Sequence, residues 1–389
     1  MKVPAFPIFD ADSHVYEPAA IWERYVEPAY RVAARSAFWH HVDAQGLASV
    51  VLNSKAGKAM NRSRIVRQAV WRPGMTPDSI GAMDASRYQP INPGSQDAKA
   101  RLRDMDELGV ERALLFPTLF AEYLPVVQNP DVAYALARGY NDWLLEFCDA
   151  SPKRLYPVAV LPTQDIVFAL EELRRMAAKG VKAAFIRPVY TNERFLNYTY
   201  FYPLFEELER LNVAAFVHPS PGTTNPEWAS TGPFVERVAD NLRIGHNIAE
   251  AVAPVMDAGT ALVGLAFCGH LEEYPKLKLA IAHAGASWVP LALEKVETFA
   301  TVTPTIRDIS LEPGHVFVER PSLVTFDASE VTVARMPDFF ATVAAWGSRY
   351  PHHDTSTPQE AIETLRRWEV PEGKIAAMMG GNVARFLGV

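Results

Sequence analysis

The chain has 389 residues, of which 49% are hydrophobic and 21% charged, with a formal net charge of −7. This composition is typical of a folded globular protein, and the length allows one large domain or two of ordinary size. No Lys/Arg-rich run stands out, which argues against a nucleic-acid partner.

The cysteine content and the first residues bear on location. Cys148 and Cys268 are too few for a disulfide framework and indicate a reducing compartment. The start "MKVPAFPIFD" has no long apolar run, so we expect no signal peptide. The longest nearly uncharged stretch, residues 258–271, is too short and glycine-rich to span a membrane. We therefore expect a cytoplasmic protein without a membrane partner.

Eight short apolar runs have the nearly continuous hydrophobic character of strands that are buried on both faces. They lie at residues 6–12, 112–118, 155–163, 181–188, 213–220, 277–285, 322–328 and 342–348.

Helical patterns lie between these runs. In "DAKARLRDMDELG", Leu102, Met105 and Leu108 recur at helical spacing and Gly109 ends the pattern. Similar patterns cover residues 165–180, 202–212, 287–300 and 357–368, and "GNVARFLGV" forms a closing helix.

The alternation of strands and helices indicates a parallel α/β fold. Eight strands is the number that closes a (β/α)₈ TIM barrel. The alternative is an open doubly wound sheet, but the glycine-rich turn that usually follows its first strand is missing. We predict a TIM barrel in which residues 1–389 form a single domain.

Two segments interrupt the alternation. Residues 30–97 separate the first strand from its helix and are rich in turn-forming residues. A loop of this length is usually functional or partly disordered, so we interpret it as an insertion covering the barrel mouth. A second insertion, at about residues 221–245, follows the fifth strand.

Polar residues at strand ends define the candidate site. Asp12 and His14 end the first strand in a D-x-H pattern, and His218 and His283 end the fifth and sixth strands. Taken singly, each histidine is more typical of a hydrogen-bonded core residue than of a ligand. A carboxylate and imidazoles at the same end of several strands favour a metal site suited to Zn, Mn or Fe.

The sequence also resembles a family through a series of segments in the same order. They are "FDADSHVYEP", "MDELGVERALLFPT", "YNDWLLEFCDASPKRLYPVAVLP", "FIRP", "AFVHPS", "LAIAHAGASWVP" and "GGNVARFLGV". These segments are similar to the amidohydrolase-related branch that includes aminocarboxymuconate semialdehyde decarboxylase and the resorcylate-type decarboxylases. The resemblance covers nearly the whole chain.

The resemblance implies a distorted TIM barrel with one divalent metal, Zn before Mn or Fe. It implies Asp12, His14 and His218 as metal ligands and His283 as a histidine that faces both metal and substrate. It also implies a homo-oligomer, either a dimer or a tetramer.

One position departs from the family pattern. Where the family has an aspartate ligand in "GSDYPH" after the eighth strand, this chain reads "GSRYPHH", with Arg349 at that place. A cation about 4 Å from a divalent metal is repelled by roughly 8 kcal/mol at an effective dielectric constant near 20. We therefore expect weak or absent metal unless the arginine turns away.

Arg349 allows several interpretations. It could bind a substrate carboxylate beside a metal, or it could form a metal-free cationic pocket with His283 and Arg187. It could also mark an inactive relative, or pair structurally with Asp10 or Glu17. Replacement of the lost ligand by Asp354 is a further alternative.

We predict an enzyme that acts on a small aromatic or unsaturated carboxylic acid, most simply a non-oxidative decarboxylase. His283 and Arg349 are the predicted catalytic residues, and Arg187, Arg349 and Trp288 the predicted substrate-binding residues. The alternatives are a metal-dependent hydrolase of a C–N, C–O or C–C bond, and a metal-free or inactive variant caused by Arg349.

Overall fold

The computed structural model describes residues 6–18, 20–42, 48–52, 69–83, 89–188, 194–219, 247–303 and 312–389. Its centre is a sheet of eight strands in the order β1-β4-β5-β6-β7-β8-β9-β10, in which every neighbouring pair is parallel. All eight predicted strands are present. They are β1 (Phe9–His14), β4 (Arg112–Phe116), β5 (Leu155–Val160), β6 (Ala183–Ile186), β7 (Ala214–Val217), β8 (Leu279–Ile281), β9 (Ser322–Phe326) and β10 (Ala344–Trp346).

The first and last strands meet at a seam that is closed by main-chain hydrogen bonds. The Arg349 N–H donates to the carbonyl oxygen of Asp12 at 2.7 Å, and the His14 N–H donates to that of Tyr350 at 2.6 Å. A Cβ atom on Gly347 would lie 2.6 Å from Cβ of Asp12, so this close approach requires glycine. The seam nearly completes the barrel and confirms the predicted (β/α)₈ fold.

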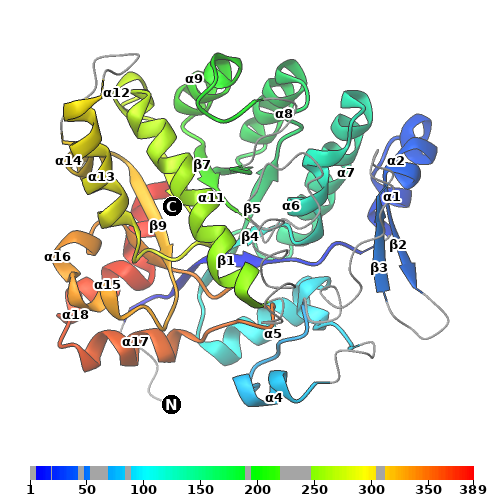
Figure 1. Cartoon of the computed structure of the whole chain (residues 1–389). Helices are drawn as coiled ribbons and strands as arrows, with labels where there is room; N and C mark the ends of the chain where they lie inside the picture. The colour runs from blue at the N-terminus through cyan, green and yellow to red at the C-terminus, as the bar shows by residue number, and fades with distance from the viewer. Residues whose placement is uncertain are drawn as a thin grey trace.

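The helices surround the strands (Figure 1). As predicted, Gly109 ends α5, in the left-handed conformation at φ 72°. Thr357 caps α17 together with Glu360. The longer helices are α5 (Ala98–Leu108), α7 (Pro130–Cys148), α8 (Ile166–Ala178), α9 (Tyr202–Leu211), α11 (Asn247–Phe267), α13 (Val289–Val302) and α17 (Pro358–Arg367). The shorter ones are α1 (Ala20–Arg24), α2 (Arg31–Ala37), α4 (Pro77–Gly81), α6 (Leu119–Tyr123), α12 (His270–Glu273), α14 (Pro313–Glu319), α15 (Val331–Arg335), α16 (Pro337–Phe340), α18 (Glu372–Ala376) and α19 (Asn382–Leu387).

A continuous core of buried apolar side chains extends from Ile8 to Leu387 and includes residues of all eight barrel strands. Burial of this apolar surface is the main contribution that holds the helices against the strands. Among the described residues, no helix combines the length and the apolar character needed to cross a bilayer.

The segment at residues 30–97 is not the long loop that its turn-forming residues suggest. It contains α2, an antiparallel pair of strands, β2 (Phe38–Val42) and β3 (Ala48–Leu52), and α4. Figure 1 shows β2 and β3 beside α1 and α2, at the margin of the molecule. The turn residues join short elements, which is why composition alone was misleading.

Part of this insertion lies against the loop that follows β10. The Trp71 N–H donates to the carbonyl oxygen of Pro351 at 3.0 Å, and Nδ2 of Asn92 donates to the Tyr350 hydroxyl at 2.7 Å. The insertion thus contacts the loop that carries Arg349, while coverage of the whole barrel mouth stays a prediction. The second predicted insertion, residues 221–245, lies outside the described residues.

Candidate active site

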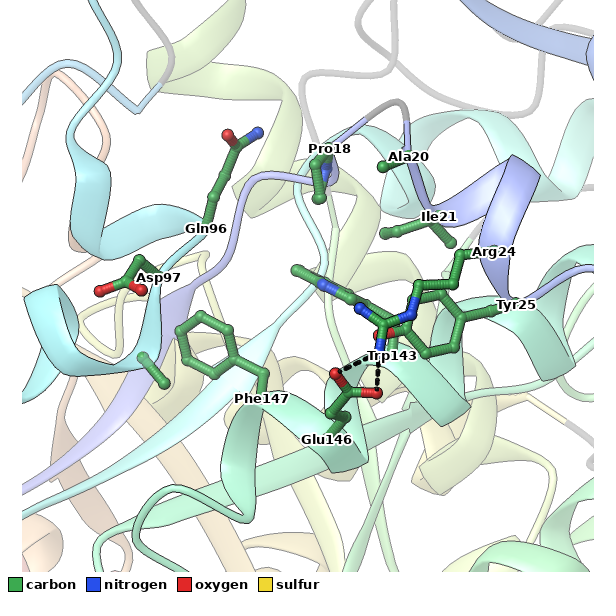
Figure 2. Close-up of a pocket in the computed structure, with 11 residues that line it drawn as sticks. Pro18, Ala20, Ile21, Arg24, Tyr25, Gln96, Asp97, Trp143, Glu146 and Phe147 are labelled. Atoms are coloured by element: carbon green, nitrogen blue, oxygen red, sulfur yellow. Dashed lines mark hydrogen bonds and ion pairs between the residues drawn. The ribbon is translucent and has the colours of Figure 1, made fainter.

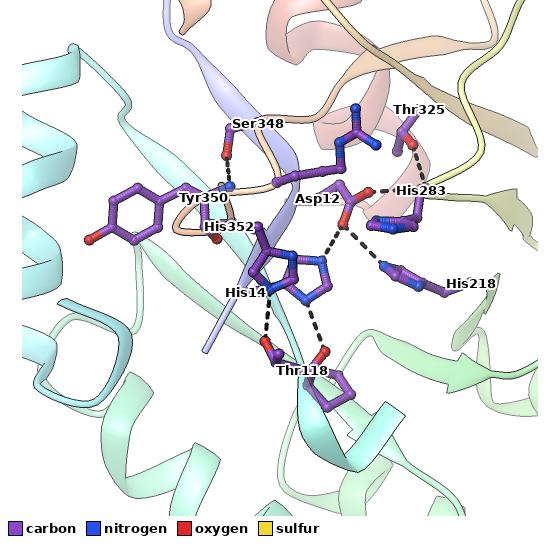
Figure 3. Close-up of polar contacts among 12 residues, drawn as sticks. Asp12, His14, Thr118, His218, His283, Thr325, Ser348, Tyr350 and His352 are labelled. Carbon is purple, nitrogen blue, oxygen red and sulfur yellow. Dashed lines mark hydrogen bonds and ion pairs between the residues drawn. The ribbon is translucent and has the colours of Figure 1, made fainter. Parts of the chain in front are cut away.

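Four side chains converge at the carboxyl ends of the strands (Figure 3). Asp12 and His14 end β1, His218 follows β7 and His283 follows β8, and their potential ligand atoms all lie within 4.8 Å of one another. Oδ1 of Asp12 is 3.1 Å from Nε2 of His14 and 3.3 Å from Nε2 of His218. The structure thus brings together the four residues that the strand ends predict.

Main-chain carbonyls fix the tautomers of two of these histidines. Nδ1 of His14 lies 2.8 Å from the carbonyl oxygen of Pro117, and Nδ1 of His218 lies 2.7 Å from that of Pro219. A carbonyl oxygen only accepts, so each Nδ1 carries the hydrogen and each neutral ring keeps its lone pair on Nε2. Both lone pairs therefore face the Asp12 carboxylate, which is itself an acceptor.

This arrangement of acceptors fits a bound cation. Nε2 of His14 and Nδ1 of His283 are buried and have no hydrogen-bond partner within the described part of the chain. Buried nitrogen lone pairs beside a carboxylate oxygen are costly unless a proton or metal ion lies between them. A carbonyl bond to the opposite ring nitrogen is also the usual arrangement of metal-binding histidines.

The charge states of the site follow from burial and mutual contacts. Burial opposes the charge on Asp12, but His218 and His14 outweigh it and hold the Asp12 pKa well below its usual range. Burial lowers the pKa of His218, and burial together with His218 lowers that of His283. The centre therefore combines the anionic Asp12 carboxylate with the neutral imidazoles of His218 and His283, a protonation state suited to metal binding.

His283 occupies an unusual backbone conformation. Its φ is 60°, in the left-handed region, and its N–H donates to Oδ2 of Asp12 at 3.0 Å and lies 3.1 Å from Oγ1 of Thr325. Its ring stacks on His218 with 4.9 Å between centroids. Such strained positions are held by surrounding structure and are concentrated at functional sites.

Glu330 ties together the loops that follow β8 and β9. Its carboxylate accepts the N–H groups of Ala286, Ser287 and Asp327 at 2.7–3.1 Å, together with the Ser287 hydroxyl. One partly buried carboxylate thus joins the loop of His283 to the loop of Asp327.

Arg349 is held between two carboxylates. Its Nη2 lies 2.7 Å from Oδ2 of Asp327 and its Nη1 3.1 Å from Oδ2 of Asp354. Burial opposes the charge on Arg349, but Asp354 and Asp327 together raise its pKa. Burial raises the pKa of Asp327 to about 6 while Arg349 acts in the opposite direction, so both members of this pair are charged at neutral pH.

Two of the alternatives left open for Arg349 are not supported by the contacts. Arg349 does not pair with Asp10 or Glu17, because Asp10 accepts the N–H and hydroxyl of Ser348 and Glu17 accepts the N–H groups of residues 118–120. Asp354 binds Arg349 and is not part of the four-residue cluster. The expected repulsion of a metal by Arg349 is reduced, since two carboxylates offset one guanidinium.

The other two predicted site residues lie near strand or helix ends. Arg187 directly follows β6, is buried, and donates from Nη1 to the carbonyl oxygen of Ala121 at 3.2 Å. Nε1 of Trp288 donates to the carbonyl oxygens of Ala284 and Gly285 at the start of α13. The indole N–H of Trp288 is thus already hydrogen-bonded to main-chain oxygens of the preceding residues.

His352 is a site residue that the sequence interpretation left without a role. Its ring stacks on that of His14, with 4.3 Å between centroids and an interplanar angle of 30°. Nε2 of His352 lies 2.9 Å from Oγ1 of Thr118, and burial lowers the pKa of His352 well below its usual range. The sequence feature that could have identified His352 as a site residue is its position in "GSRYPHH", three residues after Arg349.

A separate cavity of about 300 Å³ lies outside the barrel (Figure 2). It is lined by residues of α1, α5 and α7, and the ion pair of Arg24 and Glu146 spans one side at 2.9 Å. None of its lining residues belongs to the cluster of Asp12, so it is not the site described above.

The chain is a TIM barrel whose carboxylate–imidazole cluster, at the carboxyl ends of the strands, could hold a metal ion. The chain belongs to the amidohydrolase family, whose model, described as "Amidohydrolase", matches residues 38–389. The family prediction made from the sequence segments is thereby confirmed.

Curated relatives within this similarity are decarboxylases. The chain is 24% identical to a 2-amino-3-carboxymuconate-6-semialdehyde decarboxylase of Dictyostelium discoideum over 79% of this chain and 81% of that protein. It is 26% identical to a gamma-resorcylate decarboxylase of Rhodococcus jostii over 57% of this chain and 66% of that protein.

Solved structures share the fold. An amidohydrolase of Mycobacterium avium subsp. paratuberculosis matches with a TM-score of 0.77 at 18% identity and covers 99% of both chains. A dihydroxybenzoic acid decarboxylase of Polaromonas, solved with bound manganese and the inhibitor 2-nitroresorcinol, matches with a TM-score of 0.64 at 17% identity, covering 98% of this chain and 97% of that one.

Proposed function

We propose that this protein is a metal-dependent non-oxidative decarboxylase of a small aromatic or unsaturated carboxylic acid. The observation that carries the proposal is the convergence of Asp12, His14, His218 and His283, with two Nε2 lone pairs directed at one carboxylate. The decarboxylase activities of the relatives support the reaction type, since fold alone does not define function.

A divalent metal would be held by Asp12, His14 and His218, with His283 next to it. Oxygen and imidazole ligands suit Zn²⁺, Mn²⁺ and Fe²⁺, and the manganese-bound neighbour makes Mn²⁺ an ion to test beside Zn²⁺. Such an ion would supply positive charge for binding a substrate carboxylate and for stabilising negative charge during decarboxylation.

The chain's own residues supply orientation and a proton pathway. Arg187, buried at the carboxyl end of β6, is placed to bind the substrate carboxylate as a second cation. His283, next to the proposed metal ligands, would deliver a proton to the carbon that loses CO₂. Arg349 acts through its pairs with Asp327 and Asp354, which hold the β9 and β10 loops together beside the centre.

The proposal also covers the cellular location, the oligomeric state and the role of Trp288. The free thiols Cys148 and Cys268 support a cytoplasmic location, and the resemblance supports a homo-oligomer. Any contact of Trp288 with the substrate would be made by its ring, because its N–H is already bonded.

The test joins metal analysis with a substrate screen. Protein purified without added metal is analysed by mass spectrometry, then loaded with Mn²⁺ or Zn²⁺ and incubated with hydroxybenzoic and muconic acids. Release of CO₂ without any hydrolysis product supports the proposal. Hydrolysis of an amide or ester without CO₂ release would favour the hydrolase, and loaded protein inactive on every acid would contradict the proposal.

A further inference from the structure

One ring nitrogen of His352, Nε2, is hydrogen-bonded to another residue of the protein, Thr118. The hydroxyl of Thr118 donates its single hydrogen to the carbonyl oxygen of Val15 at 2.7 Å. Oγ1 of Thr118 can then only accept from His352, so Nε2 of His352 carries the hydrogen at 2.9 Å. This fixes the tautomer and leaves the lone pair of the His352 ring on Nδ1.

The stacked geometry shows where this lone pair lies. His14 and His352 each direct one ring nitrogen at the segment Pro117–Thr118, as the two dashed lines in Figure 3 show. The other nitrogen of His14 is directed at Asp12, and the rings are stacked 4.3 Å apart. Nδ1 of His352 is therefore directed away from Thr118, one ring layer from the metal-binding nitrogen of His14.

The contact between His352 and Thr118 is held in place by buried neighbouring residues. Glu17 is fully buried and accepts the Thr118 N–H at 3.0 Å, which holds the threonine in place. His352 is 9% exposed, and Nδ1 makes no hydrogen bond to the described part of the chain. The His352 ring is thus nearly buried and fixed in one tautomer, and its Nδ1 is oriented so that it can accept a hydrogen bond from a bound ligand.

We propose that His352 is a substrate-contacting residue whose Nδ1 accepts a hydrogen bond from a hydroxyl group of the bound acid. Thr118 is a positioning residue that fixes the His352 tautomer. The inference rests on the proposed function and narrows its substrate class to acids that carry a hydroxyl group as well as a carboxylate.

The test compares acids that differ by one hydroxyl group. Binding of benzoate and of 2-, 3- and 4-hydroxybenzoate to metal-loaded protein is measured by calorimetry. At least one hydroxybenzoate should bind the wild type about five- to tenfold more tightly than benzoate, the range expected for one hydrogen bond. In His352→Phe, which keeps an aromatic ring against His14, this preference should fall below about twofold.

Three further variants distinguish a direct substrate contact from a structural effect. Thr118→Val should reduce the preference because His352 loses its fixed tautomer, while Thr118→Ser should retain it. His353→Phe is the matched control and should keep the preference, and thermal unfolding confirms that each variant is folded. A preference that survives in His352→Phe overturns this inference alone, while a wild type that binds none of the four acids overturns it together with the proposed function.

Discussion

Asp12 is the residue on which the proposed metal centre depends. Its carboxylate lies within 3.3 Å of two imidazole nitrogens and is the single anion of the cluster. Asp12→Asn removes the charge with little change in shape and should lower Mn²⁺ or Zn²⁺ affinity at least about 100-fold. Metal titration followed by a fluorescent chelator gives the affinity directly.

Asp10→Asn provides the comparison, two residues earlier on the same strand. Its carboxylate accepts hydrogen bonds from Ser348 and from the main-chain N–H of Asp12 and lies outside the cluster. An asparagine oxygen can still accept these bonds, so metal affinity should change less than about fivefold. Equal loss in both variants would mean that damage to β1, and not loss of a ligand, explains the result.

Arg349→Asp restores the residue that the family resemblance implies. It should raise metal affinity more than tenfold, because a cation near the centre is removed and a carboxylate is added. It should also destabilise the metal-free protein, since Asp327 and Asp354 lose the guanidinium that lies 2.7 and 3.1 Å from them.

The two effects of Arg349→Asp are read from thermal unfolding with and without metal. The variant should unfold at lower temperature than the wild type without metal and gain more from added Mn²⁺. If metal affinity is the same in both proteins, Arg349 has no electrostatic influence on the centre. Arg349→Lys keeps the charge and serves as the comparison.

At the scale of loops and helices, Glu330 determines the position of His283. Glu330→Ala leaves the N–H groups of Ala286, Ser287 and Asp327 without their acceptor, which should cost about 2–4 kcal/mol of unfolding free energy. The His283 loop should also loosen, so metal affinity should fall about tenfold. Urea unfolding and metal titration measure these effects, and Glu294→Ala on the exposed side of α13 should change neither.

Glu207 gives a pH-dependent contact between α8 and α9. Arg210 lowers its pKa to about 2 against the effect of burial, and Arg174 of α8 adds to this. A lowered carboxyl pKa stabilises the fold above pH about 4.5, and this contribution is lost as pH falls toward 2. Because both arginines are more than half exposed, screening reduces the contribution to about 1 kcal/mol.

Urea unfolding of Glu207→Gln as a function of pH tests this contact. The variant should be less stable than the wild type at pH 7, and the difference should shrink steadily below pH 4.5. A difference that stays constant down to pH 3 would assign the effect to packing instead of charge.

The parts of the site that sequence could predict are those attached to strand ends. Asp12, His14, His218 and His283 follow apolar runs, and parallel strands bring such ends together. His352 and Glu330 lie in loops whose conformation depends on contacts with residues more than 40 positions away. Periodicity carries no information on such contacts, and the short elements within residues 30–97 were missed for the same reason.

At the scale of the whole molecule, the outer face of α13 is a candidate contact surface for a homo-oligomer. Leu291, Phe299 and Val302 are 59%, 54% and 70% exposed and lie on one side of this helix. Exposed apolar side chains grouped on one face are typical of protein–protein contacts. If α13 contributes to a homo-oligomer, Phe299→Glu should lower the mass measured by light scattering, while Val167→Glu on α8 should leave it unchanged.

The seam between β1 and β10 allows the side chain at position 349 to vary. The bond from residue 349 to Asp12 comes from the main-chain N–H, which every residue except proline provides. At φ 59° the backbone there favours Gly, Asn or Asp over Arg. A collection of position-349 variants should therefore fold with the same barrel and differ in the chemistry of the centre, so this position is a natural point at which a barrel of this kind can acquire a new activity.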